Sequence, residues 1–333
     1  MTDEIKRLKD IIDASNTVLI LPHKAPDGDA VGSAVAWFHF LLNNNKKPTI
    51  VFPDRPAAYL LPFLDGIEYL VFETQPEKSL ELAQHCDTLF CLDFNDPSRV
   101  GKEAVELISS FKGQSIMIDH HPFPSDFCTL QLSKPSVCST AQLLFECIEE
   151  MDMLSTVDKN VGQGIYLGIM TDTGSFRYPS VDAKTHFILG KLLDLGVEHF
   201  KIHEAIFDVN TLDKLQLRGF AINEKLVCIP NHPIAYISLT KGELDHFNYQ
   251  KGDTEGLVNV ILSIEGYSVA ALFVESRDGI KISFRSKGDY FVNEFSAKHF
   301  QGGGHKYAAG GFSDDTMSVT IERFETFLNE LLP

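Results

Sequence analysis

The sequence predicts an α/β protein of two domains, and three observations lead to that fold class. The chain has 333 residues, 44% of them hydrophobic, which is enough for one full core and favours two domains over one. Short β-rich apolar runs alternate with helical stretches over residues 15–196, as in a mostly parallel, doubly wound sheet. A helical, charge-mixed segment and a second group of strand-like runs follow. We therefore expect an α/β domain at residues 1–196, a helical linker at 197–225 and a smaller α/β domain at 226–333.

In the first domain, the expected strands are the compact apolar runs and the expected helices are the stretches between them. Strands are predicted at residues 17–21, 48–52, 88–93 and 115–118, and helices at 30–42, 139–151 and 161–170. Ligands of such sheets bind outside the carboxyl ends of the strands. Polar residues directly after an apolar run are therefore the first candidates for a site.

The second domain is expected to be β-rich and to end in a helix. Strands are predicted from alternating patterns at residues 226–230, 234–239, 258–264, 268–274 and 280–284. A glycine-rich stretch follows, and a final helix is predicted at residues 321–332.

Charge and composition exclude several classes of protein. The formal net charge of −17 opposes long-range attraction of polyanions, so we do not expect a protein that coats or slides along duplex nucleic acid. Short anionic substrates remain compatible with this net charge, because bound cations and a few local basic groups can hold them. The six cysteines are scattered without a CxxC pair, which favours reduced thiols over disulfides or a zinc knuckle.

Nothing in the sequence points to a membrane. The first ten residues are polar and charged, unlike a signal peptide, and no apolar run approaches the roughly 20 residues that cross a bilayer. We therefore expect a cytoplasmic protein without membrane contact.

A first polar cluster follows the strand predicted at residues 17–21. Pro26 and Gly28 form a turn that can direct His23, Asp27 and Asp29 to one point. Capping of the next helix by one of the aspartates is an equally good explanation for a single carboxylate. It gives no role to His23, however, so we treat all three residues as site candidates.

Three further polar features occupy similar positions. Asp93 closes the strand predicted at residues 88–93, where a turn residue would be the simpler interpretation. Asp119, His120 and His121 follow another buried strand, although adjacent histidines on a loop are often incidental. Asp172 ends a helix, where the macrodipole disfavours a negative charge unless a positive group compensates. Repetition of the same placement favours one shared site.

Together these residues form a metal-ligand set without thiolate. It consists of two histidines and four aspartates: His23, Asp27, Asp29, Asp93, His120 and Asp172. Nitrogen and oxygen ligands suit manganese or magnesium. Six ligands are too many for one ion with open positions, but they divide between two ions that share a carboxylate. Two ions about 3.5 to 4 Å apart can stabilise an in-line displacement at phosphorus, which predicts phosphoester hydrolysis.

The order of these motifs resembles that of the DHH phosphoesterase family. The motifs are His-x3-Asp-x-Asp, a single Asp, Asp-His-His and a final Asp. The second domain is similar to the DHHA1 domain in the runs Ile282-Ser283-Phe284-Arg285-Ser286, Gly302-Gly303-Gly304-His305-Lys306 and Ala308-Ala309-Gly310-Gly311. The resemblance therefore spans most of the chain, from His23 to Gly311.

The resemblance implies a role for each site residue. One metal would be bound by His23, Asp27 and Asp93, and the other by the set Asp29, Asp93, His120 and Asp172. Asp93 would bridge the two ions. Asp119 would orient the neighbouring histidine, and His121 would face the scissile phosphate as stabiliser or proton donor.

The second domain would hold substrate across an interdomain cleft. Arg285 and His305 are the main candidates, because a guanidinium can bind phosphate with two hydrogen bonds or stack on a base. Gly302, Gly303 and Gly304 could present backbone N–H groups to a phosphate, beside Lys306, although a glycine-rich turn is more often only a turn.

Two lobes without an added domain resemble the stand-alone type known as nanoRNase, or bifunctional oligoribonuclease and PAP phosphatase. That type implies two divalent ions, Mn²⁺ before Mg²⁺, and short single-stranded RNA or a small nucleotide as substrate. Removal of the 3′-phosphate from 3′-phosphoadenosine 5′-phosphate would be a further activity. A phosphodiesterase for a cyclic dinucleotide or linear pApA is an alternative, as is a nucleotide-binding regulator without turnover. A homodimer is left open.

Overall fold

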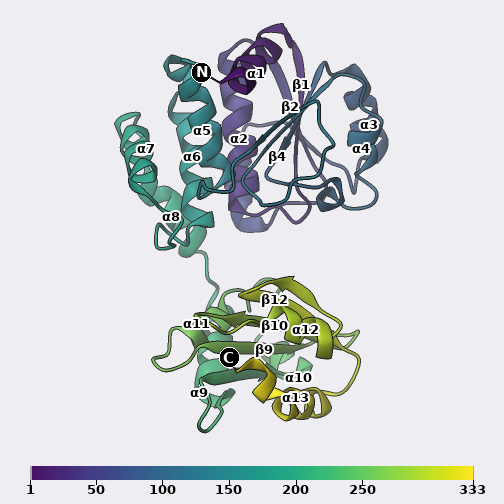
Figure 1. Ribbon diagram of the computed structural model, residues 1–333, viewed down its shortest axis with the longest axis vertical. Coiled ribbons are helices and arrows are strands. Elements are labelled where there is room, and N and C mark those ends of the chain that lie inside the picture. Colours follow the sequence, from purple (N-terminus) through teal and green to yellow (C-terminus); the bar gives the residue numbers. More distant parts are fainter. Residues whose placement is uncertain (1, 333) are drawn as a thin grey trace. The chain divides into compact units, whose positions relative to one another are not determined.

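The computed structural model describes residues 2–332, except for the side chain of His305. The chain divides into two compact units, Met1–Val209 (unit 1) and Asn210–Pro333 (unit 2). Each unit has its own sheet and its own helices (Figure 1). The division falls inside the segment that the sequence suggests as a linker, between α8 (His199–Phe207) and α9 (Leu212–Glu224).

The sheet of unit 1 is parallel throughout the described residues, with strand order β3-β2-β1-β4-β5-β6. Its strands are β1 (Thr17–Pro22), β2 (Lys47–Phe52), β3 (Tyr69–Val71), β4 (Thr88–Leu92), β5 (Gln114–Asp119) and β6 (Leu130–Ser133). The prediction of a parallel, doubly wound sheet is confirmed. The chain order reverses between β1 and β4, and the crevice outside the carboxyl ends of two such strands is where ligands of these sheets bind.

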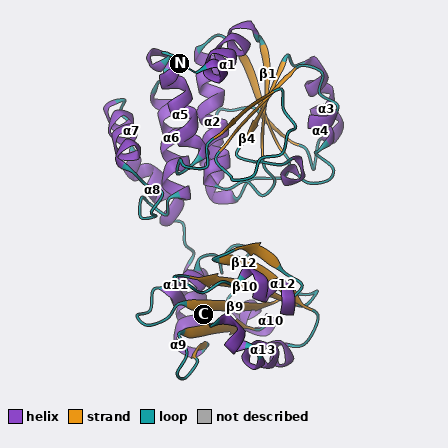
Figure 2. Ribbon diagram, in the orientation of Figure 1, coloured by secondary structure: helices purple, strands orange, loops and turns teal. Residues whose placement is uncertain are grey.

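Helices cover both faces of this sheet (Figure 2). They are α1 (Asp3–Ala14), α2 (Gly28–Asn43), α3 (Pro76–His85), α4 (Glu106–Ser109), α5 (Thr140–Glu150), α6 (Lys159–Asp172), α7 (Ala183–Asp194) and α8, with 3₁₀ turns at Ala58–Leu64, Pro97–Val100 and Leu154–Thr156. Alternate residues of β1 belong to different cores. Val18 and Ile20 pack with α2, α5 and α6, whereas Leu19 and Leu21 pack on the side of α3 and α4.

Glycines allow α2 and α6 to cross in close contact. A Cβ at Gly32 would lie 2.5 Å from the carbonyl oxygen of Gly164, and a Cβ at Gly168 would overlap Oδ1 of Asp29. A larger side chain at either position would push the two helices apart. This close crossing brings Asp29, in the first turn of α2, near Asp172, at the end of α6.

Unit 2 contains a mixed sheet with the order β11-β12-β10-β9-β8-β7 in the described residues. The strands are β7 (Leu226–Cys228), β8 (Ile234–Leu239), β9 (Val269–Glu275), β10 (Ile280–Ser286), β11 (Gly303–His305) and β12 (Ala308–Ser313). The helices are α9, α10 (Lys241–His246), α11 (Leu257–Leu262), α12 (Asn293–His299) and α13 (Met317–Thr326), with a 3₁₀ turn at Leu328–Leu331. Only β8 and β9 pair in parallel among these strands.

One predicted strand of unit 2 is wrong. The run at residues 258–264 is predicted to be a strand from its alternating pattern, but most of it forms the helix α11. Leu257, Val258 and Ile261 are the buried residues of that helix, a spacing that places them on one helical face. Packing of this face against the sheet therefore prevails over local β-propensity.

No helix within residues 2–332 combines the length and apolar character needed to span a bilayer.

Candidate metal centre

The loops that follow β1, β4 and β5 meet the start of α2 and the end of α6 at one point of unit 1. Three overlapping groups of potential metal ligands occur there: His23 with Asp27 and Asp93, Asp29 with His120 and Asp172, and Asp93 with His120 and His121. All six residues predicted as metal ligands are among them. The overlap arises because Asp93 and His120 each belong to two groups.

The first group lies where β1 leads into α2. Nε2 of His23 is 3.8 Å from Oδ1 of Asp27 and 3.5 Å from Oδ2 of Asp93. The other ring nitrogen, Nδ1, is 2.8 Å from the carbonyl oxygen of Lys24 and donates to it, which directs Nε2 toward the carboxylates. Asp27 also caps α2, since its Oδ1 accepts from two backbone N–H groups at 3.0 Å. Asp27 therefore caps α2 and also belongs to this group of potential metal ligands.

The second group centres on His120. Its Nε2 lies 3.3 Å from Oδ2 of Asp172, 4.0 Å from Oδ2 of Asp29 and 3.9 Å from Oδ1 of Asp93. Asp93 is almost fully buried and adopts a positive φ of 66° directly after β4. Aspartate tolerates this left-handed conformation better than most residues. The turn places the Asp93 carboxylate between His23 and His120.

Asp119 and His121 form a hydrogen-bonded pair at the end of β5. Nδ1 of His121 donates to Oδ1 of Asp119 at 2.7 Å, and the backbone N–H of His121 donates to Oδ2 at 3.0 Å. Asp119 is fully buried, and its hydrogen bond raises the pKa of His121 although burial of the imidazole opposes that rise. Of the two histidines that follow it, Asp119 therefore orients His121.

Thr140, at the start of α5, is a contributor that the sequence analysis missed. Its hydroxyl donates to Oδ1 of Asp93 at 2.7 Å, and its backbone N–H donates to Oδ2 of Asp29 at 2.6 Å. The N–H of Ala141 donates to the other oxygen of Asp29 at 3.0 Å. The Ser139-Thr140 pair at a predicted helix start was the available signal, because helix N-termini bind carboxylates.

The electrostatics of the cluster favour a bound cation. Burial, followed by the nearby carboxylates, raises the pKa of Asp29 well above its usual range and that of Asp172 to about 6. Burial opposes a charge on His23, but Asp27 and Asp93 outweigh it and raise the pKa of His23 to about 10. In the described part of the chain, no lysine or arginine forms an ion pair with these carboxylates. The nitrogen and oxygen donors, and the mutual repulsion of the buried carboxylates, therefore fit a site for divalent cations.

The substrate-binding residues predicted in the second domain lie on β10, on β11 and directly before and after β11. Register places Arg285 opposite Ala308, and Ala308 opposite His305, so these backbone positions are neighbours across three strands. Arg285 is half-buried and donates from Nη1 to the carbonyl oxygen of Phe284 at 2.8 Å. The side chain of His305 lies outside the described structure. Nζ of Lys306 lies 3.8 Å from the centre of the Phe291 ring, a cation–π contact.

The three predicted glycines of unit 2 differ in their surroundings. A Cβ at Gly302 would overlap the carbonyl oxygen of Gly310, and Gly304 has a φ of +140° that side chains rarely adopt. Gly303 has open space around it. Close packing explains the glycine at position 302 and backbone conformation explains it at position 304, so Gly303 is the one with room for a ligand near its backbone.

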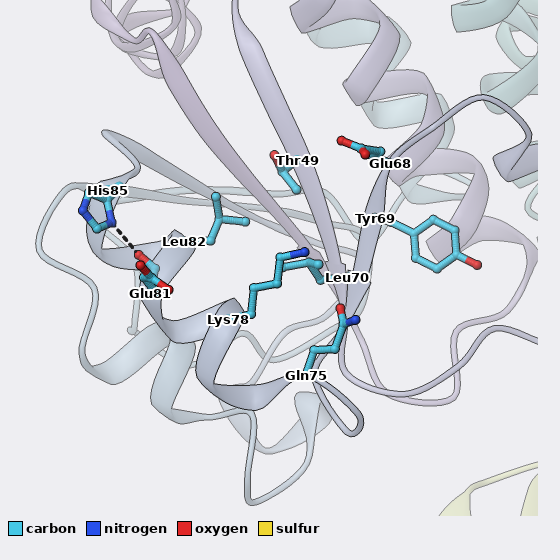
Figure 3. Close-up of a pocket in the computed structure, with 9 residues that line it drawn as sticks. All are labelled: Thr49, Glu68, Tyr69, Leu70, Gln75, Lys78, Glu81, Leu82 and His85. Atoms are coloured by element: carbon cyan, nitrogen blue, oxygen red, sulfur yellow. Dashed lines mark hydrogen bonds between the residues drawn. The ribbon is translucent and has the colours of Figure 1, made fainter.

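A separate hollow of about 510 Å³ lies at the outer edge of the unit 1 sheet, between β2, β3 and α3 (Figure 3). It is lined by Thr49, Glu68, Tyr69, Leu70, Gln75, Lys78, Glu81, Leu82 and His85. None of the predicted site residues is among them. The metal-ligand cluster is thus distinct from this hollow.

Comparisons with known sequences and structures agree with the fold. The family model described as "DHH family, N-terminal domain" matches residues 17–169, and that of the "DHHA1 domain" matches residues 231–332. A crystal structure of an exopolyphosphatase-related protein from Bacteroides fragilis is 33% identical, with a TM-score of 0.94, over 99% of this chain and 98% of that one. The chain therefore belongs to the DHH/DHHA1 phosphoesterase family, and it is an enzyme of the hydrolase class.

Two curated proteins that are similar to this chain have different named activities. The bifunctional oligoribonuclease and PAP phosphatase NrnA of Bacillus subtilis is 26% identical over 95% of this chain and 96% of its own length. The cyclic-di-AMP phosphodiesterase GdpP of the same organism is 26% identical over 97% of this chain but only 49% of its own length. The chain thus has the length of NrnA and about half the length of GdpP.

Proposed function

We propose that this protein hydrolyses short oligoribonucleotides to mononucleotides and removes the 3′-phosphate of 3′-phosphoadenosine 5′-phosphate, with two divalent cations. The observation that supports it best is the position of Asp93, which lies within reach of both His23 and His120. One carboxylate shared by two ligand groups is the arrangement that two adjacent ions require. Similarity to NrnA over nearly the full length of both chains supports the substrate class.

Each ligand would keep the role that the resemblance implies. His23, Asp27 and Asp93 would hold one ion, and Asp29, Asp93, His120 and Asp172 the other. The set contains no thiolate, which suits Mn²⁺ and Mg²⁺ alike; Mn²⁺ is the expected ion, with Mg²⁺ second, because the family resemblance implies that order. Ions bound there would supply charge that stabilises the phosphoryl oxygens, and they would lower the pKa of a bound water toward neutral pH.

The chain's own residues supply the remaining chemistry. Asp119 holds the proton on Nδ1 of His121, and its charge favours the imidazolium form. Nε2 of His121 can then give a proton to the leaving oxygen. Thr140 keeps the Asp93 carboxylate in one orientation through its hydroxyl. Arg285 would bind the substrate away from the breaking bond.

A second candidate is phosphodiester hydrolysis of a cyclic dinucleotide or of its linear product pApA. The similarity to GdpP supports it, although that relative is about twice as long. Both candidates involve attack at phosphorus by the same ligand set, so the substrates that are hydrolysed separate them. The cytoplasmic location remains a prediction.

A substrate panel with chromatography of the products tests the proposal. Purified protein with Mn²⁺ or Mg²⁺ is incubated with RNA of two to five nucleotides, 3′-phosphoadenosine 5′-phosphate, pApA and a cyclic dinucleotide, beside Asp93→Ala as control. We expect mononucleotides from the short RNA and inorganic phosphate from the bisphosphate, with no product from Asp93→Ala. Turnover of the cyclic dinucleotide alone would favour the second candidate. Binding without hydrolysis of any substrate would leave the nucleotide-binding regulator.

A further inference from the structure

Two exposed cations, Lys24 and Arg99, lie together beside the candidate metal centre. Lys24 directly follows His23, and its backbone N–H donates to the carbonyl oxygen of Arg99 at 2.8 Å. The lysine side chain runs over Gly101, where an added Cβ would lie 2.9 Å from Cδ and 3.5 Å from Nζ of Lys24. The two basic residues are 75 positions apart in sequence, and this hydrogen bond joins them at the site.

The loop that carries Arg99 is fixed between the other two loops of the site. It begins after Asp93, and Asn95 connects it to the loop after β5 by two hydrogen bonds. The Asn95 side-chain amide donates to the carbonyl oxygen of Pro122 at 2.7 Å. The N–H of Ser125 donates to the carbonyl oxygen of Asn95 at 2.8 Å. The charge of Arg99 reaches His121, where it opposes the rise in pKa caused by Asp119. Arg99 therefore lies close enough to the centre to act on it electrostatically.

Neither cation has an acidic partner in the described residues, although the chain carries 46 acidic and 29 basic side chains. Other exposed lysines do pair: Lys201 with Glu198 at 2.8 Å and Lys241 with Asp245 at 2.7 Å, for example. Within residues 2–332, neither Nζ of Lys24 nor the Arg99 guanidinium forms a side-chain hydrogen bond or an ion pair. Both groups are thus available to an anion.

From this placement we propose that Lys24 and Arg99 form a binding site for a second, non-scissile phosphate of the substrate. The guanidinium can bind phosphate with two parallel hydrogen bonds, and the ammonium adds a point charge. The site lies in the same unit as the metal ligands, whereas the sequence suggested substrate-binding residues only in the second domain. The inference rests on the proposed function, because it assigns part of that substrate.

The experiment compares substrates with two phosphates and with one. Adenosine 3′,5′-bisphosphate, which is the 3′-phosphoadenosine 5′-phosphate named above, and pApA carry a phosphate besides the one attacked. Bis(p-nitrophenyl) phosphate carries only the scissile phosphate. The full-length variants are Arg99→Ala, Arg99→Lys and Lys24→Ala. The matched control is Arg7→Ala, which removes one exposed positive charge from the same unit; Arg7 lies on α1 beside Asp87 and Gln114, at the amino ends of the strands.

We expect Arg99→Ala to raise KM for the two-phosphate substrates about 10- to 100-fold, the range for a hydrogen bond to a charged group. The kcat for these substrates, and both constants for bis(p-nitrophenyl) phosphate, should stay near wild type. Arg99→Lys should recover part of the loss. Calorimetry with adenosine 3′,5′-bisphosphate and no added metal should show the same weakening, which separates binding from catalysis.

Three outcomes would overturn the inference: an unchanged KM in both alanine variants, an equal loss for one-phosphate and two-phosphate substrates, or the same loss in Arg7→Ala. Each of these requires an active wild-type enzyme. A wild-type protein that hydrolyses none of the three substrates would instead refute the proposed function, so the two failures are distinguishable.

Discussion

Thr140→Val tests whether the hydroxyl that supports Asp93 contributes to cation binding. Thr140 is fully buried, and Oγ1 lies 2.7 Å from Oδ1 of Asp93. Valine has nearly the same shape and retains the backbone N–H that donates to Asp29. The substitution therefore removes one hydrogen bond to a carboxylate and leaves the rest of the contact in place.

The size of the effect follows from the charge on the acceptor. A hydrogen bond to a charged group contributes about 1.5–3 kcal/mol, which corresponds to a factor of about 10 to 100 in a binding constant. Removal of a residue that hydrogen-bonds to a metal ligand lowers the affinity for the metal by a similar factor. We expect the Mn²⁺ concentration for half-maximal activity to rise by that factor, with kcat at saturating Mn²⁺ close to wild type.

The assay is a titration of Mn²⁺ followed by activity and by calorimetry. The control is Thr320→Val in unit 2, where an equally buried hydroxyl donates to the neutral Oγ of Ser313 at 2.9 Å. That variant loses a hydrogen bond without touching the cluster, so its Mn²⁺ dependence should not change. An unchanged half-maximal concentration in Thr140→Val, or an equal rise in Thr320→Val, would refute the reasoning.

Three other predictions concern the cluster and the second unit. Asp93→Ala should abolish hydrolysis because both ligand groups lose a shared member, and near-normal rates would rule out a bridging role. Arg285→Ala should raise KM much more than it lowers kcat, since its proposed contact is away from the breaking bond; equal losses in kcat and kcat/KM would contradict it. Metal-free protein should lose thermal stability as pH rises from about 6.5 to 10. The pKa of His23 is near 6.5 when unfolded and about 10 when folded, so its stabilising proton is fully held below pH 6.5 and is lost as pH approaches 10. Saturating Mn²⁺ should remove this decline, and a melting temperature that rises with pH over this window in metal-free protein would disprove the assignment.

The long, strongly patterned elements of unit 1 were predictable from sequence. The four predicted strands correspond to β1, β2, β4 and β5, the buried centre of the sheet. The strands β3 and β6, at the two edges, were missed. Each has only three or four residues, too few for a periodic signal, and pairing with a neighbouring strand defines them.

In unit 2, the sequence was less informative where short apolar runs fit two structures. Residues 258–264 have the composition of a strand, yet the helix α11 forms because its apolar face packs on the sheet. The glycine-rich stretch was identified as a feature, but its pairing into β11 and β12 depends on β10 as a template. Local composition cannot encode a partner strand that is distant in the chain.

By itself, the sequence determined the sheet type and the chemical nature of the candidate ligands, because both depend on local patterns: apolar runs followed directly by histidine or aspartate. Tertiary structure alone decided which of these groups come within reach of each other. The crossing of α2 and α6 brings Asp29 near Asp172, and the start of α5 adds Thr140 to the cluster. The pairing of Asp119 with His121, and of the Lys24 loop with the Arg99 loop, was likewise decided there. Distances between side chains depend on how helices and loops pack on the sheet, and no spacing along the chain specifies that packing.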